Sequence, residues 1–225
     1  MIDIHTEIIA KTMALHSIFD LGAVFVFGIT GALAAVYRGY DFIGIFALAF
    51  VTGVGGGLIR DSVFIQQGPP AVATDSRYFI AILLSGVVGV LFHKRRKHIG
   101  KIIAFFDAIG LGAYAVVGVQ KALAASLSIP ASIMVGVINA AGGGLLRDIL
   151  VREEPLLFRP GQLYVLAALA GCVLFILLAV YAKIQAEVAA LVTIAFTFIF
   201  RLLAIKFNWS TKPLYRSEGD NEKTY

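Results

Sequence analysis

The sequence predicts an all-α membrane protein, a single transmembrane domain over residues 1–225 with seven membrane-spanning helices. Composition is the first observation, since 59% of the residues are hydrophobic, 15% are charged and the mean hydropathy is +0.88. An ordinary soluble domain carries about 25% charged residues. The second observation is that the apolar residues form long runs, and the third is a glycine-rich sequence that occurs twice.

Seven apolar stretches account for the spans, because a helix that crosses a bilayer needs roughly 20 mainly apolar residues. In chain order they cover residues 17–37, 41–66, 78–92, 102–120, 131–151, 163–182 and 187–205. The first span is expected to remain on the mature protein, because a cleavable leader begins with basic residues, whereas Asp3 and Glu7 precede this span. Residues 210–225 form a polar tail.

The glycine-rich sequence is repeated after 87 residues. TGVGGGLIRDSVF, from Thr52 to Phe64, aligns without a gap with NAAGGGLLRDILV, from Asn139 to Val151. Repeat 1 is therefore expected over residues 17–92 and repeat 2 over residues 99–182, while the seventh helix at 187–205 has no counterpart. Because each repeat holds an odd number of spans, the second is expected to lie inverted relative to the first, as in many transport proteins.

Three glycines in a row predict a break in the second span and another in the fifth. The two clusters are Gly55, Gly56 and Gly57, and Gly142, Gly143 and Gly144. Glycine costs about 1 kcal/mol relative to alanine inside a helix, and backbone groups freed within a bilayer must face protein or a water-filled cavity. The breaks would thus mark a polar interior, where Thr52 and Asn139 are expected to line a pore. Close packing of two helices through small residues is the alternative.

Acidic and basic side chains are expected to pair inside the membrane. Counted by depth along the spans, Asp20 and Arg60 both lie near the outer face, and Asp107 and Arg147 both lie near the inner face. An ionisable group within a bilayer is costly and usually pairs or lines a pathway. We therefore predict two ion pairs, one in each repeat.

Each of these arginines is followed directly by an aspartate, Asp61 in the first repeat and Asp148 in the second. Adjacent side chains on a helix point about 100° apart, so an arginine and the next residue are not expected to face the same partner. Two alternatives follow for Asp61 and Asp148: contact with water or a cation, or a second structural salt bridge.

The basic loop HKRRKH, from His93 to His98, sets the predicted orientation, because short loops rich in lysine and arginine stay in the cytoplasm. The N-terminus is then outside and the C-terminus cytoplasmic. The loop is also expected to attract anionic lipid headgroups. The basic residues flank membrane spans, so the pI of 9.4 does not indicate a nucleic-acid partner. The sequence holds no Ser-His-Asp, Cys-His or paired-carboxylate arrangement that would indicate an enzyme. Its histidines do not have the spacing of metal ligands.

The chain resembles the prokaryotic branch of the trimeric intracellular cation (TRIC) channel family over residues 17–205. The features that carry the resemblance are the doubled motif Gly-Gly-Gly-x-x-Arg-Asp, the two three-span units and the seventh helix. The resemblance implies a homotrimer in the plasma (inner) membrane of a bacterium or archaeon. Each protomer would hold its own pore for monovalent cations, mainly potassium with sodium as a second permeant ion, bounded by the second and fifth helices. No cofactor is implied.

The same domain family also carries a glycine-transporter label, so a secondary carrier for glycine or a similar small zwitterion is the alternative function. Lys121 resembles a basic residue on the fourth helix of animal members, which makes it a candidate gating or pore residue. Its alternative is a lysine that extends to the outer interface. For association of protomers, small residues recur every fourth position and let helices approach closely. They are Gly28 and Ala32, and Ala104, Ala108 and Gly112.

Overall fold

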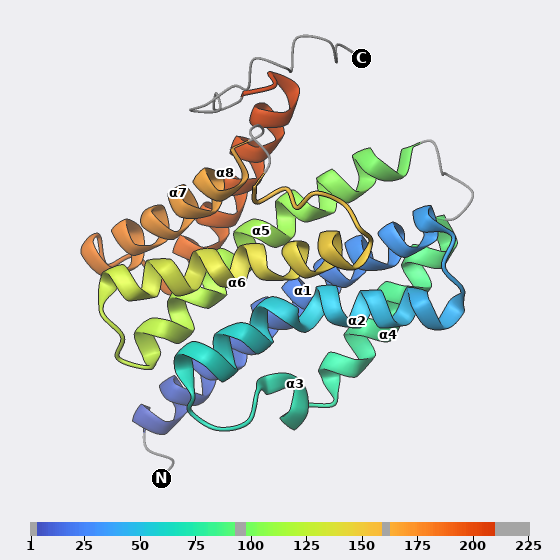
Figure 1. Ribbon diagram of the computed structural model, residues 1–225. Helices are drawn as coiled ribbons and strands as arrows, with labels where there is room; N and C mark the ends of the chain where they lie inside the picture. Colours follow the sequence, from blue (N-terminus) through green and yellow to red (C-terminus); the bar gives the residue numbers. More distant parts are fainter. Residues whose placement is uncertain (1–3, 93–97, 159–162, 210–225) are drawn as a thin grey trace.

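The structure is a computed structural model that describes residues 4–92, 98–158 and 163–209 (Figure 1). These residues form helices and the loops between them. The helices are α1 (Ile4–Arg38), α2 (Phe42–Ile59), α3 (Ala71–Thr74), α4 (Arg77–Leu91), α5 (Ile99–Ala124), α6 (Ile129–Leu150), α7 (Tyr164–Ile176) and α8 (Ala186–Lys206). Two π-helical segments continue helices, η1 (Arg60–Ile65) after α2 and η3 (Leu177–Tyr181) after α7. The predicted all-helical class is confirmed.

Within the described residues, six helices are long and apolar enough to cross a membrane. They cover Ser17–Arg38, Phe42–Ile65, Ile99–Ala124, Ile129–Leu150, Tyr164–Tyr181 and Ala186–Lys206, which correspond to six of the seven expected spans. The remaining one is α4, an apolar helix of 15 residues. At 1.5 Å per residue α4 is about 22 Å long, shorter than a hydrocarbon core of about 30 Å. The count of seven spans therefore stays a prediction.

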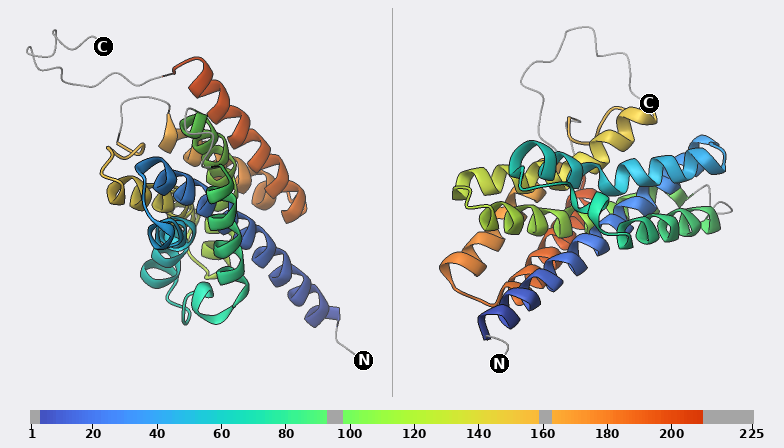
Figure 2. Two further views of the ribbon diagram at one scale, coloured as in Figure 1. Left: turned by 90° about the vertical axis from the view of Figure 1, so that its right-hand side faces the viewer. Right: turned by 90° about the horizontal axis from the view of Figure 1, so that it is seen from below.

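Helices α1 and α5 are the most buried of the apolar helices and lie at the centre of the bundle. Helix α1 packs on α2 and α4, and α5 packs in the same way on α6 and α7, while α1 contacts α5 and α2 contacts α6. This pattern is what two similar units would produce, although their inversion stays a prediction. Helix α8 lies against α5 and α7, and the N-terminal end of α1 extends beyond the bundle (Figure 2).

The predicted breaks at the glycine clusters are wrong. Helix α2 stays α-helical through Gly55, Gly56 and Gly57 and ends at Ile59, and α6 continues through its own glycines to Leu150. The helices persist because the modest propensity cost of glycine is smaller than the several kcal/mol for each backbone group left unpaired in a bilayer. In the first repeat the departure from α geometry begins after the glycines, at Arg60.

The glycines instead let α2 and α6 cross closely, which was the alternative explanation. A β-carbon added to Gly56 would lie within 3.0 Å of the backbone oxygen of Asn139. One added to Gly143 would lie within 3.0 Å of the backbone oxygen of Thr52. Because both obstacles are backbone atoms, neither contact can be relieved by turning a side chain. The helix backbones are therefore in direct contact at this crossing.

Small residues elsewhere also pack within the chain. A β-carbon at Gly28 would meet Ser85 of α4, Gly89 of α4 lies against Ala32, and Gly112 of α5 lies against α8 at Ile194. The expectation that Gly28, Ala32 and Gly112 join protomers is therefore wrong, because these residues pack against neighbouring helices of the same chain. Residues 93–97 of the basic loop from His93 to His98, and the tail at 210–225, lie outside the described residues, so the predictions made for them stay open.

Candidate functional site

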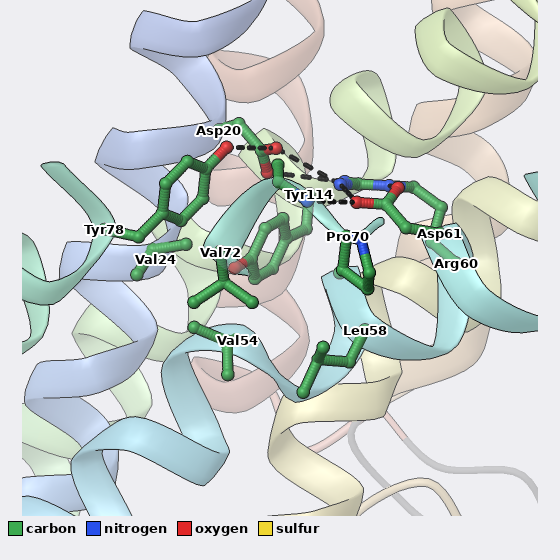
Figure 3. Close-up of a pocket in the computed structure, with 12 residues that line it drawn as sticks. Asp20, Val24, Val54, Leu58, Arg60, Asp61, Pro70, Val72, Tyr78 and Tyr114 are labelled. Atoms are coloured by element: carbon green, nitrogen blue, oxygen red, sulfur yellow. Dashed lines mark hydrogen bonds and ion pairs between the residues drawn. The ribbon is translucent and has the colours of Figure 1, made fainter. Parts of the chain in front are cut away.

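The predicted pair of Asp20 and Arg60 is confirmed, and it is fully buried. The guanidinium of Arg60 donates to both carboxylate oxygens of Asp20, with Nη2 to Oδ2 at 3.1 Å and Nη1 to Oδ1 at 3.3 Å. The same guanidinium also binds the next residue, Asp61, with Nε to Oδ1 at 2.7 Å (Figure 3). Only 1% of the Arg60 side chain is exposed, so two carboxylates neutralise this cation away from solvent.

Two further residues complete this group of side chains. The Nζ of Lys121 lies 3.1 Å from Oδ2 of Asp20 and 3.6 Å from Oδ2 of Asp61. The hydroxyl of Tyr78 donates to the same Asp20 oxygen at 2.8 Å. Lys121 is thus held among the carboxylates instead of extending away from them, and 26% of its side chain is exposed. We call Asp20, Arg60, Asp61, Tyr78 and Lys121 the first charged cluster.

The second predicted pair, Asp107 and Arg147, is also confirmed. Nη1 of Arg147 lies 3.0 Å from Oδ1 of Asp107, and Nε donates to Oδ1 of Asp148 at 2.9 Å. Nη1 also donates to the hydroxyl of Thr30 at 3.0 Å, which connects α6 to α1. We call Thr30, Asp107, Arg147 and Asp148 the second charged cluster. Lys121 and Asp107 are separated by 14 residues of α5, so the two clusters are about 21 Å apart along that helix.

Asp61 and Asp148 form the second structural salt bridge, which was one of the two alternatives. Among the described residues the arginine and the following aspartate have no common third partner, as expected, but they also bind each other. In both clusters Nε contacts the adjacent carboxylate, and Nη2 of Arg60 also donates to Oδ2 of Asp61 at 3.0 Å. The end of the guanidinium reaches the aspartate on the facing helix, Asp20 or Asp107. Each aspartate also accepts a backbone N–H, from Ala71 to Asp61 at 3.3 Å and from Leu156 to Asp148 at 3.0 Å.

A pocket lies beside the first charged cluster, between helices of both predicted repeats (Figure 3). Its lining residues are Asp20, Val24, Val54, Gly57, Leu58, Arg60, Asp61, Pro70, Ala71, Val72, Tyr78 and Tyr114. The hydroxyl of Tyr114, on α5, donates to the backbone carbonyl of Gly53 on α2. This hydrogen bond ties the two helices together next to the pocket. Sequence reasoning missed Tyr78 and Tyr114, although Tyr78 begins the third expected span at the depth of Asp20.

Thr52 and Asn139, the predicted pore-lining pair, are both completely buried and neither lines this pocket. The Asn139 amide donates to the backbone oxygen of Tyr114 at 2.7 Å and accepts from Arg60 at 3.4 Å. The Thr52 hydroxyl lies against Gly31 and has no hydrogen-bond partner in the part of the chain that the structure describes. Asn139 therefore connects the two repeats, and a pore role for this pair stays a prediction.

Comparison with known sequences agrees with the duplicated geometry. The family model described as glycine transporter matches twice, over residues 17–94 and 104–180. The UPF0126 membrane protein of Vibrio cholerae is 33% identical over 202 residues, covering 89% of this chain and 83% of that protein. The UPF0126 inner membrane protein YadS of Escherichia coli K12 is 29% identical, over 84% of this chain and 91% of that protein.

Solved TRIC channel structures have the same fold. The TRIC trimeric intracellular cation channel orthologue from Rhodobacter sphaeroides has a TM-score of 0.80 and 31% identity, over 86% of this chain and 98% of that one. A second structure, described as the structural basis for conductance through TRIC cation channels, has a TM-score of 0.76 and 33% identity, over 89% and 98% of the chains. These neighbours are channels and not enzymes, in agreement with the expectation from sequence. The chain is a membrane protein of the trimeric intracellular cation channel family, which the glycine-transporter model also describes.

Proposed function

We propose that this protein conducts monovalent cations passively, mainly potassium, through a pore in each protomer of a homotrimer. The observation that carries the proposal is the likeness to structures of TRIC cation channels, at 31% and 33% identity over 98% of those chains. Buried carboxylates at two depths of the bundle support it, because intramembrane ionisable groups mark ion pathways. The glycine-transporter alternative has only the name of a family model behind it.

Recording from purified protein in planar lipid bilayers tests this function directly. A channel gives unitary current steps, carried by potassium and unaffected by added glycine, and their reversal potential in potassium and sodium gradients gives the ion preference. A carrier gives saturable glycine uptake into vesicles without unitary steps, and that result would replace the channel with the alternative function.

We further propose that the pore begins at the pocket beside the first charged cluster and continues past Tyr114. The Tyr114 hydroxyl bound to the Gly53 carbonyl joins α5 to α2 at this point, so an ion that passes must separate these groups. The position 87 residues earlier, Phe27, lacks the hydroxyl, and its ring stacks on that of Tyr114 with centroids 5.2 Å apart. A phenylalanine at position 114 is therefore compatible with this packing.

Tyr114→Phe is expected to raise the open probability by roughly two- to tenfold. A single hydrogen bond contributes about 0.5–1.5 kcal/mol, and 1.4 kcal/mol is about tenfold in an equilibrium. Single-channel recording measures the change. Tyr40→Phe is the matched control, because it also removes a hydroxyl that donates to a backbone carbonyl, that of Leu150 at 3.4 Å, away from the pocket. Equal open probabilities in both variants would place the constriction elsewhere.

Thr52 is proposed as a ligand for a partly dehydrated cation, because its buried hydroxyl has no partner among the described residues. Thr52→Val keeps the shape and removes this oxygen, so the unitary potassium conductance should fall by up to about tenfold for a barrier increase of about 1.4 kcal/mol. Thr197→Val on α8 is the control, since that hydroxyl is equally buried and unpartnered. The same conductance in Thr52→Val as in the parent would remove Thr52 from the pore.

The proposed orientation has the N-terminus outside and the C-terminus in the cytoplasm, in a plasma (inner) membrane. Its support is the basic residues that follow the spans, together with the ion pair of Arg38 and Glu153 at 2.8 Å, which joins the last turn of α1 to the loop after α6. On this orientation Lys121 lies at the outer end of α5 and is proposed to act in gating. Tag accessibility in intact cells tests the orientation, and native mass spectrometry tests the trimer.

A further inference from the structure

The two charged clusters differ at one carboxylate oxygen. In the first cluster Oδ2 of Asp20 has three partners: Arg60 at 3.1 Å, Lys121 at 3.1 Å and the Tyr78 hydroxyl at 2.8 Å. In the second cluster Oδ1 of Asp107 binds Arg147, but Oδ2 has no hydrogen-bond partner within the described ranges 4–92, 98–158 and 163–209. Asp107 is 0% exposed. A buried carboxylate oxygen without a partner is costly, so this oxygen calls for a ligand.

The difference follows from one substitution between the repeats. Lys121 supplies a second cation to the first cluster, and the position 87 residues earlier holds Ala34. Ala34 lies one turn after Thr30 on α1, so the two residues share a face of that helix, and Thr30 contacts Arg147. Position 34 thus points toward the second cluster but carries no ammonium group.

A second unpartnered oxygen lies beside Asp107. The Tyr164 hydroxyl is buried, and it too has no hydrogen-bond partner in the described part of the chain. A β-carbon added to Gly144 would lie 3.1 Å from this hydroxyl oxygen and 3.6 Å from Oδ1 of Asp107. The Tyr164 hydroxyl and the Asp107 carboxylate therefore border the same small space beside Gly144, and Nη2 of Arg147 would lie 3.8 Å from the same added carbon. This space is not filled by residue 144, which has no side chain.

The position of the hydroxyl is fixed by packing on the ring of Tyr164. The guanidinium carbon of Arg201, from α8, lies over this ring at 4.8 Å from its centroid. The cation thus covers the face of the ring, not the edge that carries the hydroxyl. The oxygen remains directed at the space beside Gly144.

We propose that the second charged cluster binds a monovalent alkali cation between Oδ2 of Asp107 and the hydroxyl of Tyr164. The cation would take the part that the Lys121 ammonium has in the first cluster, since both are single positive charges that bind oxygen. Arg60 and Lys121 both contact the carboxylates of Asp20 and Asp61, whereas among the described residues Arg147 is the cation bonded to Asp107 and Asp148, and Arg201 covers the face of the Tyr164 ring. Water completes the coordination. The proposal rests on the proposed function for the choice of potassium as the probe.

Thermal unfolding of the purified protein in detergent tests the site. Potassium chloride replaces N-methyl-D-glucamine chloride at constant ionic strength, so only the identity of the cation changes. The melting temperature of the parent protein should rise with potassium and then saturate. Tyr164→Phe keeps the ring under Arg201 and removes one ligand, so the potassium midpoint should increase by about five- to tenfold. Tyr78→Phe, the matched control in the first cluster, should keep the parent midpoint.

A second variant tests the comparison with Lys121. Ala34→Lys should bring an ammonium to the second cluster and abolish the dependence of melting on potassium. Should this variant fail to fold, Tyr164→Phe decides alone. Equal melting temperatures of the parent in the two salts would overturn the proposal and leave a water molecule between the oxygens. An unchanged midpoint in Tyr164→Phe would overturn it as well.

The thermal unfolding experiments do not depend on ion flux. The proposed cation site and the proposed channel function are therefore tested independently. A protein that conducts potassium in bilayers and melts identically in both salts loses the site and keeps the channel. A protein that potassium stabilises, but that shows no unitary currents, keeps the site and loses the channel.

Discussion

Gly56→Ala will destabilise the folded protein by about 2–3 kcal/mol, whereas Gly57→Ala, one residue later, will leave the stability nearly unchanged. The new methyl group at position 56 would lie within 3.0 Å of the backbone oxygen of Asn139, so α2 and α6 must move apart. Overpacking of this kind costs about 1–3 kcal/mol. At position 57 the nearest atom is Nη2 of Arg60, at 3.5 Å, which is an ordinary contact. The better helix propensity of alanine can even add stability there.

Gly143→Ala gives the same comparison from the other helix, because its methyl group would lie within 3.0 Å of the backbone oxygen of Thr52. Thermal unfolding in detergent measures the effect for all three variants, with size-exclusion chromatography as the readout of folded protein. If Gly56→Ala and Gly57→Ala unfold at the same temperature, the crossing of α2 and α6 has room for a methyl group at position 56. If Gly56→Ala folds normally and only its conduction is lost, the glycines act on the pore and not on packing.

Asp20→Asn is expected to cost about 3–5 kcal/mol, the range for removing one partner of a buried ion pair. This single carboxylate receives Arg60, Lys121 and Tyr78 together, and an amide cannot balance the charges. Adding Arg60→Gln to the same chain should recover part of the loss, because the buried cation is then gone as well. A double-mutant cycle on thermal unfolding measures this coupling.

The control for this cycle is the pair of Arg38 and Glu153, whose side chains are 35% and 40% exposed. Glu153→Gln should change stability little, because exposed ion pairs contribute about 0–1 kcal/mol. Purely additive losses in Asp20→Asn and Arg60→Gln would mean that the two residues stabilise the protein independently, contrary to the geometry of the first cluster.

The ion pairs could be predicted from the sequence because membrane depth is a simple function of position along a span. Asp20 with Arg60, and Asp107 with Arg147, were the charged residues that shared a depth, and the bilayer makes an unpaired charge expensive. The motif itself did not reveal that Asp61 and Asp148 bind the preceding arginine, since that depends on how a long side chain bends. Lys121 could not be assigned a partner from the sequence. At its depth a lysine side chain can reach either the membrane interface or the buried carboxylates.

The glycines illustrate the limit of local reasoning. The low helix propensity of Gly56 and Gly143 predicts a break in each helix, but propensity says nothing about which backbone lies opposite. Here that backbone belongs to the other repeat, at Asn139 and Thr52, and the contact needs glycine while the helix stays intact. Tyr78 was missed for a related reason, since its partner Asp20 is 58 residues away and a tyrosine in an apolar span has many ordinary explanations.

The two buried ion pairs also bear on how the chain enters a membrane during synthesis. In each pair the aspartate and the arginine are separated by 40 residues, and both belong to one helical hairpin. The first hairpin is α1 with α2 and its continuation η1, and the second is α5 with α6. Each hairpin can thus neutralise its arginine as soon as its second helix emerges, before the rest of the protein exists. The contacts of Asn139, Thr30 and Lys121 cross between the hairpins and form only when the two insert side by side. The order of the residues along the chain therefore allows each arginine to be paired within its own hairpin before the two halves pack together.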